Sequence, residues 1–175
     1  MIISPIKLKE KHPNESIESL TEKIIAIESA IRNYTKNNFQ DRRVRFNVEI
    51  KDNICTPWNP LIKEGDTVTL SQGINEGFYN VESSSPDGIK LSGDIVDTTS
   101  NLLTKVIYPA DVMSVAMDLV KWTVEYSDKQ AMGISSESIS RYSVSYGNMN
   151  SSGANINGYP VSIMSRLNPY MKAKF

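Results

Sequence analysis

Residues 109–130, PADVMSVAMDLVKWTVEYSDKQ, predict one long and unusually apolar α-helix. Pro109 suits the first helical position, and Asp111 places a negative charge in the first turn, where the helix dipole favours it. At about 100° per residue the polar side chains fall in one arc of roughly 100°, and the apolar ones fill roughly 220°. A surface helix of a monomer typically shows an apolar stripe only about 100° wide. The helix therefore needs packing partners on at least two sides, and we expect neighbouring subunits to supply one of them.

A second long helix is predicted over about residues 16–37, after a short one over residues 6–11. The short helix begins with Ser4 as the N-cap and Pro5 at the first helical position. In the long one, apolar residues recur at alternating spacings of three and four, as in a heptad seam. They are Ile17, Leu20, Ile24, Ile27, Ile31 and Tyr34.

From residue 42 the hydrophobic period changes to two. Val44, Phe46, Val48 and Ile50 alternate with polar residues, which is typical of a half-buried strand. Further strands are predicted over residues 66–70, 78–82, 89–92 and 104–108. Their lengths and turns fit a small barrel or sandwich placed between the two long helices. The predicted fold class is α+β, a small helical scaffold of two long helices plus short terminal helices, with an inserted small β-barrel or sandwich.

Four segments follow from these patterns. Residues 1–41 form the first part of the helical scaffold, and residues 42–103 form the inserted β subdomain. Residues 104–146 hold the central helix and a following extended segment. Residues 147–175 begin with a flexible loop rich in Gly, Asn and Ser and end in a basic, aromatic tail. A tail of this composition is typical of a segment that orders upon binding a partner.

Composition excludes several classes of protein. Of the 175 residues 39% are hydrophobic and 22% charged, typical of a globular protein, and the formal net charge of −1 gives no global case for nucleic-acid binding. The single cysteine, Cys55, excludes an internal disulfide, so we expect a reducing compartment. The N-terminus lacks the pattern of a signal peptide, and no run approaches the roughly 18 apolar residues of a membrane span. We expect a protein that remains in the cytoplasm or in an assembly built there, without membrane contact.

Residues able to carry catalysis are few. His12 is the only histidine and lies beside Pro13, and Cys55 has no histidine near it in the sequence. Asp94 and Asp97 could pair as carboxylates, but in a polar turn this spacing usually marks solvated charges. The sequence therefore predicts no enzyme, no cofactor and no metal.

A nucleic-acid-binding module is the alternative. Arg42, Arg43 and Arg45 form the only dense basic cluster and would lie on the edge of a small barrel. The acidic neighbours Asp41 and Glu49 favour a mixed solvated surface instead.

The order of elements resembles the head–tail connector (adaptor, or head-completion) proteins of tailed bacteriophages, in the prophage-type form with an inserted β region. The resemblance covers about residues 1–40 and 104–175. Its parts are Ser4-Pro5, residues 30–35 (AIRNYT), residues 108–112 (YPADV), Lys121-Trp122, residues 133–139 (GISSESI), residues 142–146 (YSVSY), Ile163, Leu167 and Pro169-Tyr170.

The resemblance implies a structural virion protein of the neck, assembled in the host cytoplasm. Such proteins form a ring, commonly a dodecamer, that docks on the portal protein and extends the DNA channel toward a stopper or tail-completion protein. DNA would pass through without sequence-specific binding. The implied portal contacts lie in the C-terminal tail: Tyr159, Ile163, Leu167, Pro169, Tyr170, Lys172, Lys174 and Phe175.

The apolar helix faces predict where copies of the chain meet, through a heterologous interface of the kind that closes rings. The predicted interface residues are Val112, Val115, Leu119, Trp122, Tyr126, Ile24, Ile27 and Ile31.

Overall fold

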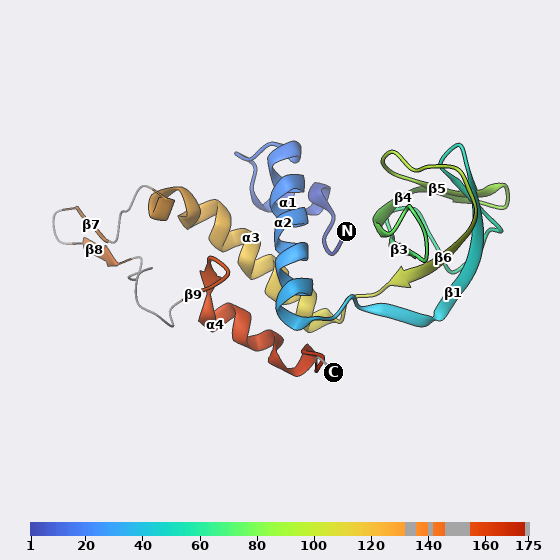
Figure 1. Ribbon diagram of the computed structural model, residues 1–175. Coiled ribbons are helices and arrows are strands. Elements are labelled where there is room, and N and C mark those ends of the chain that lie inside the picture. Colours follow the sequence, from blue (N-terminus) through green and yellow to red (C-terminus); the bar gives the residue numbers. More distant parts are fainter. Residues whose placement is uncertain (132–135, 140–141, 146–154, 174–175) are drawn as a thin grey trace. The chain divides into compact units, whose positions relative to one another are not determined.

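The computed structural model describes residues 1–131, 136–139, 142–145 and 155–173 (Figure 1). The chain forms two compact units. One contains Met1–Ser4 and Asn38–Tyr108, and the other contains Pro5–Asn37 and Pro109–Phe175. We call them the barrel unit and the helical unit.

The barrel unit is a closed antiparallel barrel with the strand order β1-β2-β5-β4-β3-β6 (Figure 1). Its strands are β1 (Gln40–Lys51), β2 (Ile54–Thr56), β3 (Thr67–Ser71), β4 (Gly77–Ser85), β5 (Gly88–Leu91) and β6 (Thr98–Val106). Inward-facing apolar side chains from all six strands fill the interior. The barrel closes because β1, its first strand, pairs with β6, its last strand, as well as with β2. β1 therefore has no free edge.

The predicted fold class is wrong. A closed six-stranded barrel is the dominant element of a mixed α/β chain with four helices in its described residues, where we expected a small barrel inserted into a scaffold of two long helices. The alternation rule underestimated the sheet because β2, with only three residues, is too short to show a period of two, whereas the strand predicted over residues 66–70 corresponds to β3. Polar strand ends were missed too, since the serine-rich end of β4 (Gly77–Ser85) pairs with β5.

In its described residues the helical unit contains four helices, a 3-10 turn and two antiparallel strand pairs. The helices are α1 (Pro5–Lys11), α2 (Ile17–Thr35), α3 (Ala110–Ala131) and α4 (Val161–Met164), and the 3-10 turn is η1 (Ser165–Tyr170). The strand pairs are β7 (Ser136–Ile139) with β8 (Tyr142–Ser145) and β9 (Asn155–Ile156) with β10 (Tyr159–Pro160). The first eight residues of the loop expected at 147–158 lie outside the described residues. None of the helices in the described ranges is long and apolar enough to cross a membrane.

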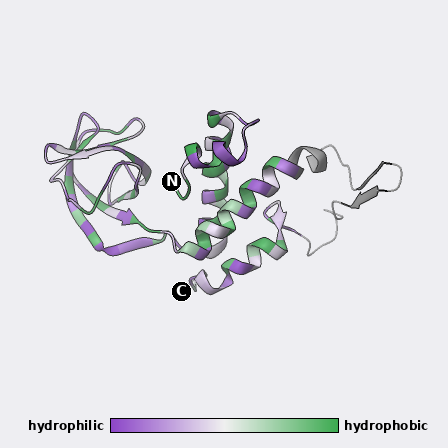
Figure 2. Cartoon of the chain, turned by 180° about the vertical axis from the view of Figure 1, so that it is seen from behind, coloured by the Kyte–Doolittle hydropathy of each residue, from purple (hydrophilic) through white to green (hydrophobic). Residues whose placement is uncertain are grey.

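Local signals in the sequence explain where α2 begins and ends. The Ser16 side chain accepts a hydrogen bond from the Ser19 amide (3.0 Å), which satisfies one of the free N–H groups of the first turn. Lys36 adopts a left-handed conformation (φ +52°) just after the last helical residue and ends the helix. Polar and apolar segments alternate along α2 and α3 (Figure 2), and the apolar faces of both helices are buried in this unit.

Candidate functional site

Most of the predicted subunit interface is buried inside the helical unit. α2 and α3 pack on each other, and six predicted interface side chains are at most 1% exposed: Ile24, Ile27, Ile31, Val112, Val115 and Leu119. Trp122 is half-buried, and the side chain of Tyr126 lies outside the described part of the structure. The six buried residues form an intramolecular core, so a neighbouring subunit would have to contact other side chains.

The chain's own residues cover most of the apolar arc of α3. Trp122 is half-buried on the opposite side of the helix. The other incompletely covered large apolar side chains with described burial are Met113 (37% exposed), Met117 (38% exposed) and the half-buried Val124. At about 100° per residue these three span an arc of about 40°. A partner would therefore meet a narrow strip of α3 and not the broad face that the sequence predicts.

The C-terminal segment that was expected to reach a partner packs on α2 and α3 of its own unit. Met164 and Leu167 are fully buried. The Tyr170 hydroxyl donates to Asp111 Oδ2 (3.0 Å), and the Lys172 amide donates to the Thr35 carbonyl (2.8 Å). The segment is therefore fixed to both long helices as far as residue 172.

Polar contacts near the middle of this segment hold it as well. The Arg166 guanidinium pairs with Asp118 and donates to Ser114 Oγ (3.2 Å), and the Tyr34 hydroxyl donates to Asn168 Oδ1 (2.6 Å). The hydrogen bond to the Asp111 carboxylate raises the pKa of Tyr170.

The predicted portal-binding residues consequently lie in different environments. Leu167 is buried, and Tyr159, Ile163 and Tyr170 are half-buried, whereas Pro169 and Lys172 are exposed. Lys174 and Phe175 lie outside the described residues. The exposed end of the described segment is Met171, Lys172 and Ala173.

A pocket of about 280 Å³ opens where α3 meets the C-terminal segment. Trp122 and Ile163 form its apolar lining, and Asp118, Lys121 and Glu125 supply charges of both signs. The Trp122 ring meets Tyr159 edge to face, with centroids 5.9 Å apart, and burial raises the pKa of Tyr159. The mixed charge and aromatic lining suit a protein partner more than a small anion.

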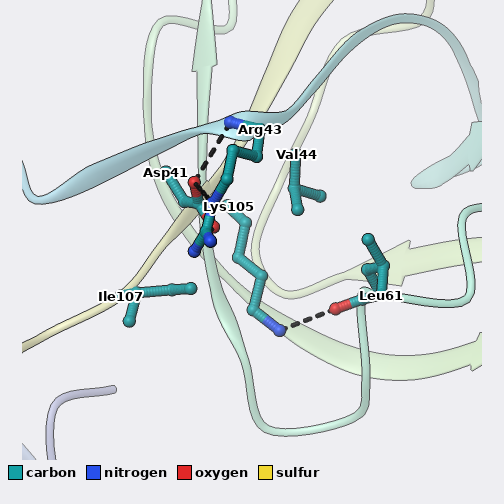
Figure 3. A pocket seen from close by; sticks show the side chains of 6 residues that line it. All are labelled: Asp41, Arg43, Val44, Leu61, Lys105 and Ile107. Atoms are coloured by element: carbon teal, nitrogen blue, oxygen red, sulfur yellow. Dashed lines mark hydrogen bonds and ion pairs between the residues drawn. The ribbon is translucent and has the colours of Figure 1, made fainter.

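A second pocket, of about 330 Å³, lies on the outside of the barrel beside a bulge in β1 (Figure 3). Gln40 pairs with Val106 and Arg45 with Thr104, so residues 41–44 all lie opposite Lys105. Bulges of this kind re-aim side chains and are frequent next to functional sites. The bulge contributes three of the six side chains that line the pocket: Asp41, Arg43 and Val44.

The charges at this pocket are neutralised internally. Arg43 donates through Nε and Nη2 to the two carboxylate oxygens of Asp41 (3.0 and 3.1 Å), which lowers the pKa of Asp41. Lys105 donates to the Leu61 carbonyl (2.7 Å) and pairs with Asp66. What remains available is the apolar lining, so the pocket suits an apolar side chain of a partner.

The basic cluster of β1 does not make the barrel unit cationic. The unit holds seven basic and ten acidic side chains, a formal charge of −3. Arg42 and Arg45 are exposed, and Arg43 is paired with Asp41. This balance does not favour the electrostatic attraction on which non-sequence-specific nucleic-acid binding depends.

The other candidate residues do not come together. Burial raises the pKa of the Cys55 thiol to about 12, which keeps it protonated inside the barrel. Asp97 accepts a hydrogen bond from the Asp52 amide (2.9 Å) and so orders a loop. Among the residues with described positions, no group of three or more His, Cys, Asp or Glu side chains could hold a metal ion. No protein-family model matches the chain, and no curated protein matches it either.

Proposed function

We propose that the protein is a structural subunit of a tailed bacteriophage, a head–tail connector that forms a ring on the portal and extends the DNA channel toward the stopper or tail. Copies of the chain, the portal and a stopper or tail-completion protein would be its partners. DNA would pass through the ring without sequence-specific contacts.

One observation carries the proposal. The two stretches that resemble connector proteins, about residues 1–40 and 104–175, are separated in the sequence, yet nearly all of both belongs to the helical unit. Within it, the C-terminal segment packs on both α2 and α3. The matching parts therefore form one structural unit, as expected if they share a common role.

The position of the C-terminal segment refines where a portal would bind. The backbone is tied to α2 and α3 as far as Lys172, but the residues Met171, Lys172 and Ala173 are exposed. A segment that is fixed at its base and exposed at its end loses less conformational entropy on binding than a free tail. We expect the portal contact to begin at Met171.

The test uses the full-length chain and the portal protein encoded in the same genome. Negative-stain imaging should show rings of the protein on the portal. A variant lacking residues 171–175 should keep its circular dichroism spectrum and lose portal binding, while the control Lys63→Ala, at an exposed position of the barrel unit, should retain it. A full-length protein that forms no ring with the portal would contradict the connector role. Binding unaffected by the deletion would remove the C-terminal end from the mechanism.

A further inference from the structure

The most exposed large apolar side chain in the described residues lies at one end of the barrel. Ile74, in the turn between β3 and β4, is 75% exposed, and Val96, in the loop between β5 and β6, is 55% exposed. The two loops are joined directly. Asn75 donates to the Val96 carbonyl (2.7 Å) and accepts from the Val96 amide (3.0 Å). Ile74 and Val96 are therefore presented together.

Further hydrogen bonds hold this end of the barrel in place. Asn75 is itself buried, and its carbonyl accepts from the Tyr79 hydroxyl (3.0 Å). Asn53 donates to the Gly93 carbonyl (2.8 Å) and accepts from the Ile95 amide (3.2 Å). An apolar pair on loops that are already ordered binds a partner with a small entropy cost.

Carboxylates surround this apolar pair. Glu76, Asp94 and Asp97 are exposed and lie within two residues of Ile74 or Val96. We call the five side chains the barrel tip: Ile74, Glu76, Asp94, Val96 and Asp97. A matching surface would be apolar at its centre and basic at its rim.

The helical unit carries an apolar strip flanked by two lysines, of which Lys121 lies beside Asp118 and Glu125. Met113 and Met117, one helical turn apart on α3, are partly exposed next to Val124. The Lys11 ammonium lies 4.0 Å from Met117 Sδ, and exposed Lys121 follows one turn later on α3. We call these the methionine patch: Lys11, Met113, Met117, Lys121 and Val124. Methionine side chains adapt their shape to a partner.

The net charges of the two units also favour a contact between the barrel of one copy and the helical unit of another. The barrel unit has a formal charge of −3, whereas the helical unit has twelve basic and ten acidic side chains and a charge of +2. The acidic tip and the methionine patch are different surfaces, so each copy can bind one neighbour through its tip and another through its patch, which is a head-to-tail contact. Head-to-tail contacts form a ring when the rotation between successive copies closes.

We propose that the barrel tip of one copy docks on the methionine patch of the next copy. The inference deepens the proposed function and rests on it for the closed ring, because a connector needs a repeated contact between subunits. It assigns the interface between copies to side chains that are exposed in the single chain, instead of to the buried residues of α2 and α3.

Single cysteines test the contact directly, since the native Cys55 is buried. Ile74→Cys and Met117→Cys are purified separately, mixed and oxidised. We expect disulfide-linked dimers in the mixture and few in either variant alone. Glu64→Cys, at an exposed barrel position outside the tip, replaces Ile74→Cys in the control mixture and should give few dimers. A yield no higher than in the control would overturn the inference.

Charge reversal adds a second readout. Lys121→Glu in the Met117→Cys variant, or Asp94→Lys in the Ile74→Cys variant, should each lower the dimer yield several-fold, and combining both reversals should restore it. A yield that neither reversal changes would overturn the charge-matched contact. The portal is the competing occupant of the patch. Protection of the Met117→Cys thiol from alkylation by the portal, without protection by a second copy, would assign the patch to the portal and also overturn the inference.

These outcomes separate the inference from the proposed function. Rings on the portal without a link between positions 74 and 117 would leave the connector role standing and reject this contact. A link between copies in a protein that does not bind the portal would support the contact and reject the connector role.

Discussion

Gly88, at the start of β5, is a position of the barrel that has no room for a side chain. Its φ is +146°, and a Cβ there would overlap Cγ2 of Ile54 and lie 3.1 Å from the carbonyl oxygen of Cys55. Gly88→Ala should therefore combine backbone strain with overpacking and lower the free energy of unfolding by about 2–3 kcal/mol. Urea denaturation followed by circular dichroism measures the loss.

Gly93 provides the matched control. Its φ is +90°, but a Cβ there would meet nothing within 4 Å. Gly93→Ala should cost only the strain of a positive φ, about 1 kcal/mol. Equal losses for the two variants would show that the contact with Ile54 is not what excludes a side chain at position 88.

At the residue scale the sequence predicts turns better than buried polar groups. Residues 86–88, Pro-Asp-Gly, have the composition of a turn, and β4 gives way to β5 there. Asn75 and Thr69 have no comparable signal, because their burial depends on loops and strands distant in the sequence. The barrel tip was missed for the same reason, since Ile74 and Val96 become neighbours only through the Asn75 side chain.

At the scale of elements, the C-terminal segment depends on burial more than on its ion pair. Leu167 is fully buried, so Leu167→Ala should lower the free energy of unfolding by about 2–5 kcal/mol. Both side chains of the Arg166–Asp118 pair are nearly half exposed, so Arg166→Ala should cost only about 0.2–1 kcal/mol. Thermal denaturation of both variants tests the ranking, and a larger loss for Arg166→Ala would contradict it.

The docking of the same segment should weaken at alkaline pH. The hydrogen bond from Tyr170 to the Asp111 carboxylate raises the folded-state pKa of the tyrosine, so the contact stabilises the neutral phenol. Its contribution to stability is complete below the ordinary tyrosine pKa of about 10 and is lost as pH rises through the higher folded value. Phenolate absorbance, measured as the difference between the native chain and Tyr170→Phe, should show the raised pKa. Asp111→Asn should lower it, and an unchanged titration would exclude this cause.

The helices show what periodicity predicts and what it leaves open. The heptad-like spacing predicted a helix over about residues 16–37, and α2 (Ile17–Thr35) lies within it. Periodicity also identified the apolar side of α3 but not what covers it. Part of the cover comes from Met164 and Leu167, in a segment too short to show a helical period of its own.

At the scale of the whole molecule, the barrel was underestimated because very short or polar strands do not show the period of two on which the prediction relied. β2 has only three residues, and β6 begins with a polar stretch in which Asn101 is buried. The change of period near residue 42 did place a β region between the long helices, although β1 already begins at Gln40. Closure of the barrel could not be predicted, because it requires pairing between β1 and β6, the first and last strands.

That pairing makes the barrel a candidate for folding alone. Gln40 pairs with Val106, and the Ile107 amide donates to the Phe39 carbonyl (2.9 Å). The Phe39 and Tyr108 rings pack at 5.0 Å, so both ends of a fragment covering residues 38–108 are held together by its own contacts. We expect this fragment to fold cooperatively and to give a dispersed NMR spectrum, because its core lies entirely within it. Val48→Asp, which places a charge in that core, is the control and should unfold it. A fragment that remains unfolded while the full chain folds would show that the barrel depends on residues outside 38–108, either Met1–Ser4 or the helical unit.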